Sequence, residues 1–584
     1  MDLPLCELWR RRPKNTHKDE ILVIDWLVIA VYLLVITVIG VYSSKKVSSS
    51  SNFFISDRKF GKWMMMFFTF GTGTNTDQAV SVASKTYVSG ASGIWYQWLW
   101  LFATPFYWLL APLFRRMRAV TTADYLNVRF GQSVAVLFAL VGILQLSVNI
   151  GVVLKASSSV ITAVSGGAIS PSIAIVGMTV LFVSYGVAGG LNAAIVTDFI
   201  QGILTIVLSF LILPFALSAV GGMSGLREII DNPEVFSIVA PSEITTLYVI
   251  VIAVNALIGW VASPYSMAMC GAGKNEHASR VGLVSGMFLK RLCTIAWVLT
   301  GLVAIALYAN TETNPDHVYG LLAREFLPTI APGLVGLFVA SLLAAVMSSC
   351  DTFMVSSAAL LTENIYKPLI KPNQDDKHYI RVGRIASVFV VVAGILIAFR
   401  LSSIVDGLVL FWIVQAMMGV AIWVSFIWRR ATSAAAWAST LSGYAVWLFT
   451  SDIDFAGWSF NAHFSRFLPE FMLYNGQLSL PWQMIFYLTV ALIVMIGVSL
   501  VTQAPSNEIL DRVYETLRTP VESGEPEVEP VTLPASTTPA PRSVLIDHPD
   551  FEIMKPTAST VYGFVACWVA VGALIASFVW ILKL

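Results

Sequence analysis

The chain contains about fourteen apolar runs of roughly 20 residues each, and these runs constrain its fold more than any other feature. A run of that length can cross a bilayer as a helix, whose backbone groups are satisfied within the segment. The runs are continuously apolar rather than alternating, which argues against a β-barrel. The sequence therefore predicts an all-α integral membrane protein. The predicted spans lie near residues 21–43, 62–86, 93–113, 133–163, 170–188, 191–219, 244–270, 283–309, 327–364, 379–400, 404–428, 431–450, 481–503 and 561–583.

Lysine and arginine residues gather in alternate loops, after the first, third, seventh, ninth and eleventh spans. Acidic or polar segments fall on the other side, at 220–243, 310–326 and 451–480. Because positive charge is enriched in cytoplasmic loops, the basic loops are predicted to be cytoplasmic and both termini to be outside. The basic N-terminal tail would then lie outside, against the same rule, but the five later basic loops support this orientation. The tail residues concerned are Arg10, Arg11, Arg12, Lys14 and Lys18.

Composition argues against several other classes of protein. Hydrophobic residues make up 57% of the 584 residues, charged residues 12%, and the formal net charge is +1, so there is no basic field for nucleic acid. The five cysteines show no zinc or disulfide spacing, and the histidines form no metal-binding motif. No nucleophile–base pair indicates an enzyme, and no resident cofactor is predicted.

The regions outside the spans differ in composition. Residues 1–20 are predicted to form a polar tail, 21–503 the main transmembrane domain with its core at about 62–428, and 561–584 the C-terminal transmembrane helix. Residues 504–560 are rich in Pro, Glu, Thr and Ser, so this loop is predicted to be cytoplasmic and largely disordered. Its first part, 506–518, is predicted to form an amphipathic helix at the membrane surface.

A carboxylate stands within an apolar run at GGLNAAIVTDFIQ, residues 189–201, where Asp198 follows Thr197. An ionisable group at membrane depth is costly and usually functional, because it needs a cation or a positive partner to stay charged. A transported cation is one candidate partner. Lys155, which like Lys85 lies at membrane depth, is another, and it could also pair with Asp77.

Two further runs contain small and polar residues. In FGTGTNTDQAV, residues 70–80, glycines and threonines weaken a membrane helix and free backbone carbonyls that could bind sodium. The alternative there is a glycine kink that serves helix packing alone. In the run 336–366, Ser348 and Ser349 offer adjacent hydroxyls to a small hard cation. The alternative is a packing face whose serines bond to their own helix.

Together these motifs resemble the sodium:solute symporter family. The pattern G-G-L-x-A-x-x-x-T-D-x-x-Q at 189–201 is similar to the family signature, and A-A-x-M-S-S followed by N-I-Y at 344–366 is similar to its eighth core helix. VTTADYLNVRFG at 120–131 and KVSSSSNFFISDRKFGKW at 46–63 resemble further family segments, and the similarity runs from about residue 23 to about 430. The resemblance implies a LeuT-like fold of two inverted five-helix repeats, spans two to six and seven to eleven, closest in helix count to the sodium/sugar cotransporter-like branch.

The resemblance also implies a sodium site. In the family, two hydroxyls and one carbonyl of the eighth core helix join two carbonyls of the broken first core helix. By position these are Ser348, Ser349, Ala345 and the backbones of Gly71 and Thr74. Asp198 matches a carboxylate of the fifth core helix that is linked to sodium coupling or to a second sodium site, so it is predicted to be a sodium-binding residue as well.

The sugar branch implies seven solute-binding positions, and amide, ammonium and aromatic groups there suit a hydroxyl-rich ligand. They are Gln78, Trp95, Tyr96, Gln97, Tyr265, Lys290 and Gln415. Lys290 could instead be a cytoplasmic anchor with Arg291, and Trp95 with Tyr96 could be part of an interfacial aromatic belt.

The predicted function is sodium-coupled secondary active symport, which imports a small polar, sugar-like solute by alternating access. The expected partners are the solute, sodium as co-substrate and the lipid bilayer of a plasma or bacterial inner membrane, with no nucleic acid. Two alternatives stay open: a proton-coupled transporter of an amino acid or organic acid on the same fold, and a solute sensor that does not transport. The sequence leaves the solute, the stoichiometry and the oligomeric state undefined.

Overall fold

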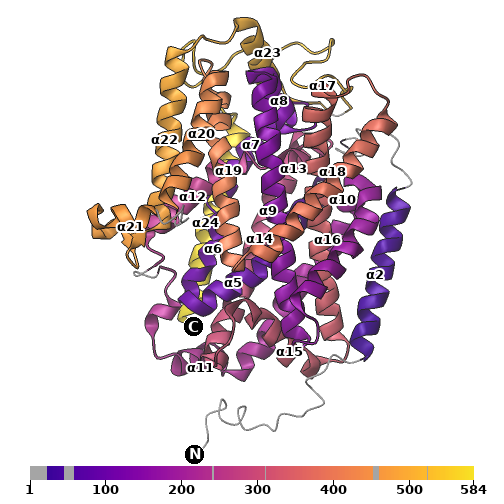
Figure 1. The fold of residues 1–584 in the computed structure, drawn as a ribbon, viewed down its shortest axis with the longest axis vertical. Coiled ribbons are helices and arrows are strands. Elements are labelled where there is room, and N and C mark those ends of the chain that lie inside the picture. Colours follow the sequence, from indigo (N-terminus) through magenta and orange to yellow (C-terminus); the bar gives the residue numbers. More distant parts are fainter. Residues whose placement is uncertain are drawn as a thin grey trace, which may run out of the picture.

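The computed structural model describes residues 23–44, 58, 60–239, 243–309, 311–451, 459–522 and 524–584. The polar tail 1–20 lies outside these ranges, and so do the side chains of residues 36, 37, 39–44 and 184–198. Across the described ranges the chain consists of helices and one antiparallel pair of two-residue strands (Figure 1). The all-α class predicted from the apolar runs is confirmed.

The first part of the chain carries one helix ahead of the core and then a helix that is broken in two. Its helices are α2 (Val23–Ser44), α4 (Lys62–Gly73), α5 (Thr76–Ser89), α6 (Trp95–Trp98), α7 (Thr104–Arg116), α8 (Thr122–Phe130), α9 (Gln132–Val164) and α10 (Pro171–Ala219), with the 3-10 turn η3 (Gly90–Ile94) before α6.

The second part repeats this plan, again with a broken helix near its start. It contains α11 (Gly222–Ile229), η4 (Pro233–Phe236), α12 (Thr246–Trp260), α13 (Ser266–Gly271), α14 (Glu276–Tyr308), η5 (Pro315–His317), α15 (Val318–Ile330), α16 (Leu334–Leu361), the π-turn η6 (Thr362–Tyr366), α17 (Lys367–Leu369), α18 (Asp376–Arg400) and α19 (Ile404–Ile427). The remaining elements are α20 (Ser433–Thr450), α21 (Phe460–Phe464), η7 (Ser465–Phe467), η8 (Glu470–Met472), β1 (Leu473–Tyr474), β2 (Gln477–Leu478), α22 (Leu480–Val501), α23 (Asn507–Arg518) and α24 (Ala558–Lys583).

Eight segments of the described chain are helices long and apolar enough to cross a membrane, and three shorter apolar helices accompany them. The count of about fourteen spans therefore stays a prediction. Several predicted spans fall on two helices each, since 62–86 covers α4 and α5, and 244–270 covers α12 and α13.

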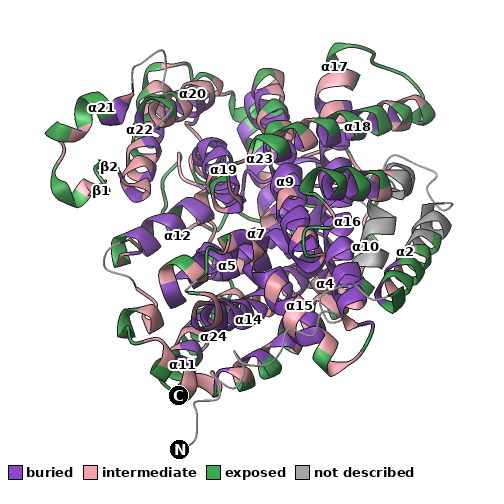
Figure 2. Ribbon diagram, turned by 60° about the horizontal axis from the view of Figure 1, so that its bottom comes forward, coloured by how far each residue is buried: buried purple, intermediate pink, exposed green. Residues whose placement is uncertain are grey.

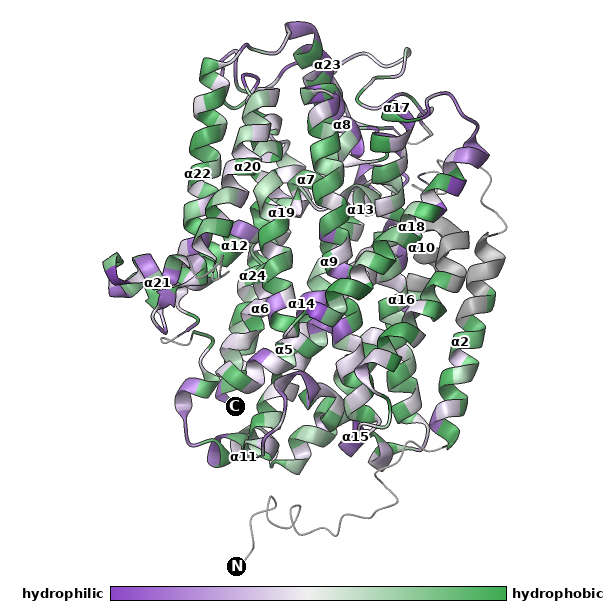
Figure 3. Cartoon of the chain, in the orientation of Figure 1, coloured by the Kyte–Doolittle hydropathy of each residue, from purple (hydrophilic) through white to green (hydrophobic). Residues whose placement is uncertain are grey.

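Burial separates an inner set of helices from an outer one. The most apolar window of the helix Leu334–Leu369 is 89% buried, whereas that of α24 is 22% buried. Exposed residues gather on outer helices such as α2 and α18, while α5, α9 and α16 are mostly buried (Figure 2). Hydrophobic residues cover the outer faces of α18 and α22, and hydrophilic residues gather toward the two ends of the molecule (Figure 3). An apolar girdle around a packed centre is the surface that lipid requires.

Helix α10 covers two predicted spans, 170–188 and 191–219. A straight helix of 49 residues would be about 74 Å long, more than twice the bilayer core. Both of its ends lie near the end of the molecule that carries α11 and α15: Gly166 contacts Arg324 of α15, and α11 follows directly after Ala219 (Figure 1). The element therefore does not run as one straight rod across the molecule.

The segment between α22 and α24 differs from the predicted disorder. Helix α23 is present where an amphipathic helix was predicted, and its apolar face packs on the bundle rather than on a membrane surface. Leu510, Val513, Tyr514 and Leu517 are all buried at helical spacing, and the Tyr514 hydroxyl donates to the Ser425 carbonyl at 2.8 Å.

The rest of this segment is held by charges and free carbonyls at helix ends. Arg118 pairs with the half-buried Glu525, and Arg429 pairs with the buried Glu552 at 2.8 Å. The Val531 amide donates to the Met117 carbonyl at 2.8 Å. Composition predicted disorder because the segment has no core of its own, but the segment folds onto groups that the ends of α7 and α19 supply.

Both ends of the described chain lie at one end of the molecule. Asp25, near the start of α2, accepts a hydrogen bond from the Gly336 amide at 2.8 Å, close to α15. Arg227 of α11 donates to the Leu582 carbonyl near the end of α24. Helix α23 lies at the opposite end (Figure 1). Residues 23 and 584 therefore lie at the same end of the molecule.

Candidate functional site

The break between α4 and α5 lies in the middle of the bundle. Thr74 and Asn75 adopt extended backbone conformations, which end one half-helix at Gly73 and start the next at Thr76. The freed Gly73 carbonyl accepts hydrogen bonds from Gln78 Nε2, at 2.8 Å, and from Lys290 Nζ. The glycine-rich sequence is thus a true break and not only a packing kink.

A second break divides α12 from α13, where a continuous span 244–270 was predicted. Pro264 lies in the gap, and its missing N–H and fixed φ prevent the helix from continuing. Side chains replace the lost bonds: Ser266 Oγ donates to the Trp260 carbonyl at 2.9 Å, and Ser263 Oγ donates to Gln415 at 2.9 Å. The proline inside the apolar run was the signal for this break.

Two of the predicted sodium ligands, Ser349 and Gly71, come together where α16 packs against the end of α4. Ser349 Oγ lies 3.4 Å from the Gly71 carbonyl oxygen, across two elements far apart in sequence. Ser348 is 1% exposed and Ser349 0%, and Ala345 lies one helical turn earlier on α16. Thr74, at the end of α4, is also buried. The cluster is built of hydroxyl and carbonyl oxygens, the ligand type that hard cations such as sodium select.

Asp198 lies on α10, but its side chain is outside the described part of the structure. Its pairing with Lys155 or with a cation therefore stays a prediction. Lys155 is half-buried on α9, and its carbonyl accepts hydrogen bonds from Ser158 and Ser159. No described carboxylate lies within ion-pair distance of it.

Lys85, the other predicted membrane-depth cation, has a partner that the sequence did not indicate. Its ammonium pairs with Glu243, which also accepts from Ser89 Oγ at 2.7 Å. The ammonium lies 5.3 Å from the centre of the Tyr96 ring. The contact ties the end of α5 to the segment that leads into α12.

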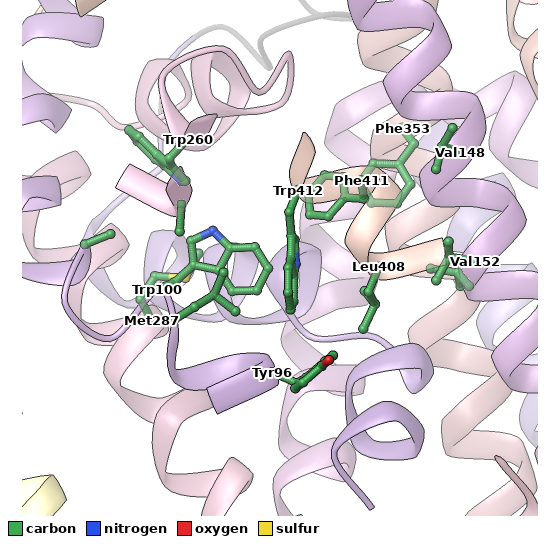
Figure 4. Packing of buried hydrophobic residues seen from close by; sticks show 14 of the residues in the cluster. Tyr96, Trp100, Val148, Val152, Trp260, Met287, Phe353, Leu408, Phe411 and Trp412 are labelled. Atoms are coloured by element: carbon green, nitrogen blue, oxygen red, sulfur yellow. The ribbon is translucent and has the colours of Figure 1, made fainter. Parts of the chain in front are cut away.

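A cavity of about 60 Å³ lies between the two breaks. Aromatic rings and polar side chains line it together. The lining residues are Thr72, Gly73, Asn75, Asp77, Gln78, Gln97, Trp100, Tyr107, Asn149, Val152, Val153, Trp260, Tyr265, Met269, Met287, Lys290, Arg291, Phe353, Leu408 and Phe411. In Figure 4, Trp100 lies between Trp260 and Trp412, and Phe411, Phe353 and Leu408 lie on the far side of Trp412.

Four of the seven predicted solute-binding residues line this cavity: Gln78, Gln97, Tyr265 and Lys290. Lys290 is 5% exposed and lies 5.6 Å from the centre of the Trp100 ring, so it is no surface anchor. Its ammonium also interacts electrostatically with the carboxylate of Asp77, another lining residue.

The other three lie outside the lining. Trp95 Nε1 donates to the Ile238 carbonyl at 2.5 Å. The Tyr96 hydroxyl is 3.2 Å from that of Tyr248. Gln415 accepts from the Ser263 hydroxyl of the second break. Trp95 and Tyr96 are 3% and 4% exposed, so they do not form an interfacial belt.

Sequence reasoning missed the aromatic side of the cavity. Trp100 lies in the turn after α6, Trp260 on α12 and Phe411 on α19. Only the fold brings these three side chains together. The Trp100 and Phe411 ring centres are 6.2 Å apart. Tryptophans within apolar runs, away from the run ends, were the available signal.

Comparisons with known proteins agree with this architecture. Residues 53–443 match the sodium:solute symporter family. The osmoregulated proline transporter OpuE of Bacillus subtilis (strain 168) is 23% identical over 446 residues, which cover 72% of this chain and 88% of that protein. The sodium/glucose cotransporter of Vibrio parahaemolyticus is 25% identical over 419 residues, which cover 65% and 76%.

The fold is also found among solved structures. A sodium-coupled sialic acid symporter in its substrate-bound outward-open state superposes with a TM-score of 0.71 at 18% identity, over 83% of this chain and 99% of that one. The LeuT-like fold that the sequence implied is thereby confirmed.

Proposed function

Because the chain belongs to the sodium:solute symporter family, we propose that it imports a small, polar, hydroxyl-rich solute together with sodium by alternating access. The family consists of symporters rather than enzymes, and sodium is their co-substrate rather than a resident cofactor. The chain is accordingly a multi-pass membrane protein with sodium and a small solute as its partners. The class of solute, the direction of transport and the residues that bind sodium and solute are our proposals.

One observation carries the sodium site, namely the approach of Ser349 on α16 to the Gly71 carbonyl at the end of α4. We assign sodium to the oxygens of Gly71, Thr74, Ala345, Ser348 and Ser349. The C-terminal end of a half-helix carries partial negative charge, which favours a cation there. Asp198 on α10 is proposed to act on the same ion through its charge.

The solute class rests on the lining of the cavity. Amide groups of Gln78 and Gln97, the ammonium of Lys290 and the carboxylate of Asp77 can donate and accept several hydrogen bonds at once. Aromatic faces such as Trp100 cover the apolar side of a sugar ring. A sugar or polyol fits this mixture, and Trp95, Tyr96 and Gln415 are assigned to holding the wall in place.

The distribution of positive charge between the two ends of the molecule supports the proposed topology. The end that carries α8, α23 and the arginines at the end of α7 is assigned to the cytoplasm, since positive charge is retained there. Residues 504–560 are then cytoplasmic and both termini are outside. Inward opening would separate the cytoplasmic ends of the two repeats. The binding site would then become accessible from the cytoplasm instead of the outside, without moving far itself.

A binding screen tests the solute class. Purified protein is heated with a panel of sugars, polyols, amino acids and carboxylates, in sodium chloride or in choline chloride. A hydroxyl-rich solute should raise the unfolding temperature in sodium chloride only. Lys290→Met should abolish the shift, whereas Lys155→Met, a membrane-depth lysine outside the cavity lining, should retain it. Stabilisation by an amino acid or organic acid without sodium would instead favour the proton-coupled alternative.

A counterflow assay separates transport from sensing. The solute found in the screen is loaded into proteoliposomes, and exchange with labelled solute outside is followed. Exchange supports a transporter. Sodium-dependent binding without any exchange would identify a sensor.

A further inference from the structure

The side chain of Asn75 lies between the proposed sodium site and the solute cavity. Asn75 is 7% exposed and forms the extended link between α4 and α5. Asparagine at the start of a helix commonly caps the first turn with its side chain. Asn75 makes no such bond to the first turn of α5, which the structure describes in full, so its amide is left for another role.

One edge of the Asn75 amide joins the sodium cluster. Ser349 Oγ donates to Asn75 Oδ1, and the same hydroxyl lies 3.4 Å from the Gly71 carbonyl. Asn75 and Ala345 also line a cavity of about 20 Å³, enough for one water-sized particle. The oxygens of Asn75, Ser349 and Gly71 thus lie together, and Ala345 shares a small cavity with Asn75.

The other edge of the amide faces the solute cavity. The Asp77 carboxylate lies two residues from Asn75, and both residues line that cavity. Because Asn75 Oδ1 accepts from Ser349, the N–H edge of the amide is left for another partner, and a carboxylate, which only accepts, suits that edge. Asp77 Oδ1 has no hydrogen-bond partner within the described residues, so it is available to a solute.

We propose that Asn75 couples the two sites. Its Oδ1 is a sodium ligand in addition to the five family positions, and its N–H holds Asp77 toward the solute. When sodium is absent, Ser349 donates to Oδ1. When sodium binds, Ser349 Oγ and Asn75 Oδ1 both turn their lone pairs to the ion. The ion then holds the Asn75 amide in one orientation, and the amide N–H holds the Asp77 carboxylate. The inference rests on the proposed sodium site and adds a residue and a coupling route to it.

Sodium itself is the probe that tests the proposal, so no solute needs to be known. The unfolding temperature of the purified protein is measured against sodium chloride concentration, with choline chloride keeping the ionic strength constant. A ligand that binds only the folded state raises this temperature by mass action. Asn75→Ala should raise the sodium midpoint on the order of tenfold, the loss typical of one good polar contact to a charge. An unchanged midpoint in Asn75→Ala would overturn the proposal.

Two further variants separate a ligand from a merely structural residue. Asn75→Asp retains an oxygen toward Ser349, so its sodium midpoint should equal or fall below that of the wild type. A midpoint raised as far as in Asn75→Ala would contradict a ligand role. Asn255→Ala is the matched control, because Asn255 is a fully buried amide that bonds Trp412 and Tyr487 outside the cavity. It should lower the unfolding temperature and leave the sodium midpoint unchanged.

A double-mutant cycle tests the link to Asp77. Asp77→Asn should raise the sodium midpoint in the wild-type background and have a clearly smaller effect in Asn75→Ala, because the link is then already lost. Equal fold-changes in both backgrounds would show that Asp77 acts without Asn75. Absence of any sodium stabilisation in the wild type would refute the proposed sodium site itself, so the two failures are distinguishable.

Discussion

Gly282 and Gly286 on α14 form a close contact with α4, and Gly286→Ala is the sharpest packing test that the structure offers. A Cβ at Gly286 would lie 2.6 Å from the Met66 carbonyl oxygen and 3.0 Å from the Phe70 nitrogen. Both are backbone atoms that cannot rotate away. Ordinary contact begins near 3.4 Å, so α14 would have to retreat by about 0.8 Å.

The cost follows from these contacts. Overpacking against a rigid neighbour costs about 1–3 kcal/mol, and the better helix propensity of alanine returns up to about 1 kcal/mol. A net loss of about 1–2 kcal/mol lowers the unfolding temperature of a chain of 584 residues by about 1–2 °C. The same retreat pulls Lys290, one turn further along α14, away from the Gly73 carbonyl, so solute binding should weaken as well.

The assay is thermal unfolding followed by tryptophan fluorescence, with Gly497→Ala as the matched control. Gly497 lies on α22, and no heavy atom among the described residues lies within 4 Å of a Cβ built there. The control should be unchanged or slightly more stable. If Gly286→Ala unfolds at the same temperature as Gly497→Ala, the close packing of α14 on α4 is wrong.

Three other predictions concern the ends and the centre of the molecule. Replacing Ser348 and Ser349 together by alanine should raise the sodium concentration for half-maximal uptake at unchanged expression, and unchanged sodium dependence would remove them from the site. Asp198→Asn should slow or uncouple transport in stable protein while Asp198→Glu retains partial activity, as measured by sodium-driven uptake; full coupling in Asp198→Asn would refute the role of the charge. Arg118→Ala removes the charge-assisted hydrogen bonds to the half-buried Glu525, which costs on the order of 1–3 kcal/mol locally and should speed protease cleavage within 519–556; an unchanged cleavage rate would show that the ion pair does not hold this segment.

Local sequence signals were sufficient for the parts of the site that depend on a single segment. Gly71 and Gly73 indicated a broken helix because glycine weakens a helix wherever it stands. The paired hydroxyls of Ser348 and Ser349 indicated an oxygen site because they lie next to each other in an apolar run. The structure brings Ser349 and Gly71 together as the resemblance implied, while their role as ligands stays a proposal.

Signals that depend on long-range packing were not readable. Hydropathy predicted one continuous span over 244–270, because it does not register the missing N–H of Pro264. The segment 504–560 has few apolar residues, so composition predicted disorder. Its order comes from partners such as Arg118 and Arg429, which lie more than 80 positions away from the groups they bind. Pairings of that kind follow only from the fold.

Sodium-driven uptake in proteoliposomes tests the central claim most directly. Protein is reconstituted with potassium inside and sodium outside, at equal pH on both sides, and the solute found in the binding screen is followed over time. Accumulation above the outside concentration should require the sodium gradient, vanish when choline replaces sodium, persist with a protonophore and fail in the Ser348→Ala, Ser349→Ala double variant. Accumulation that follows a pH gradient and ignores sodium would contradict the account.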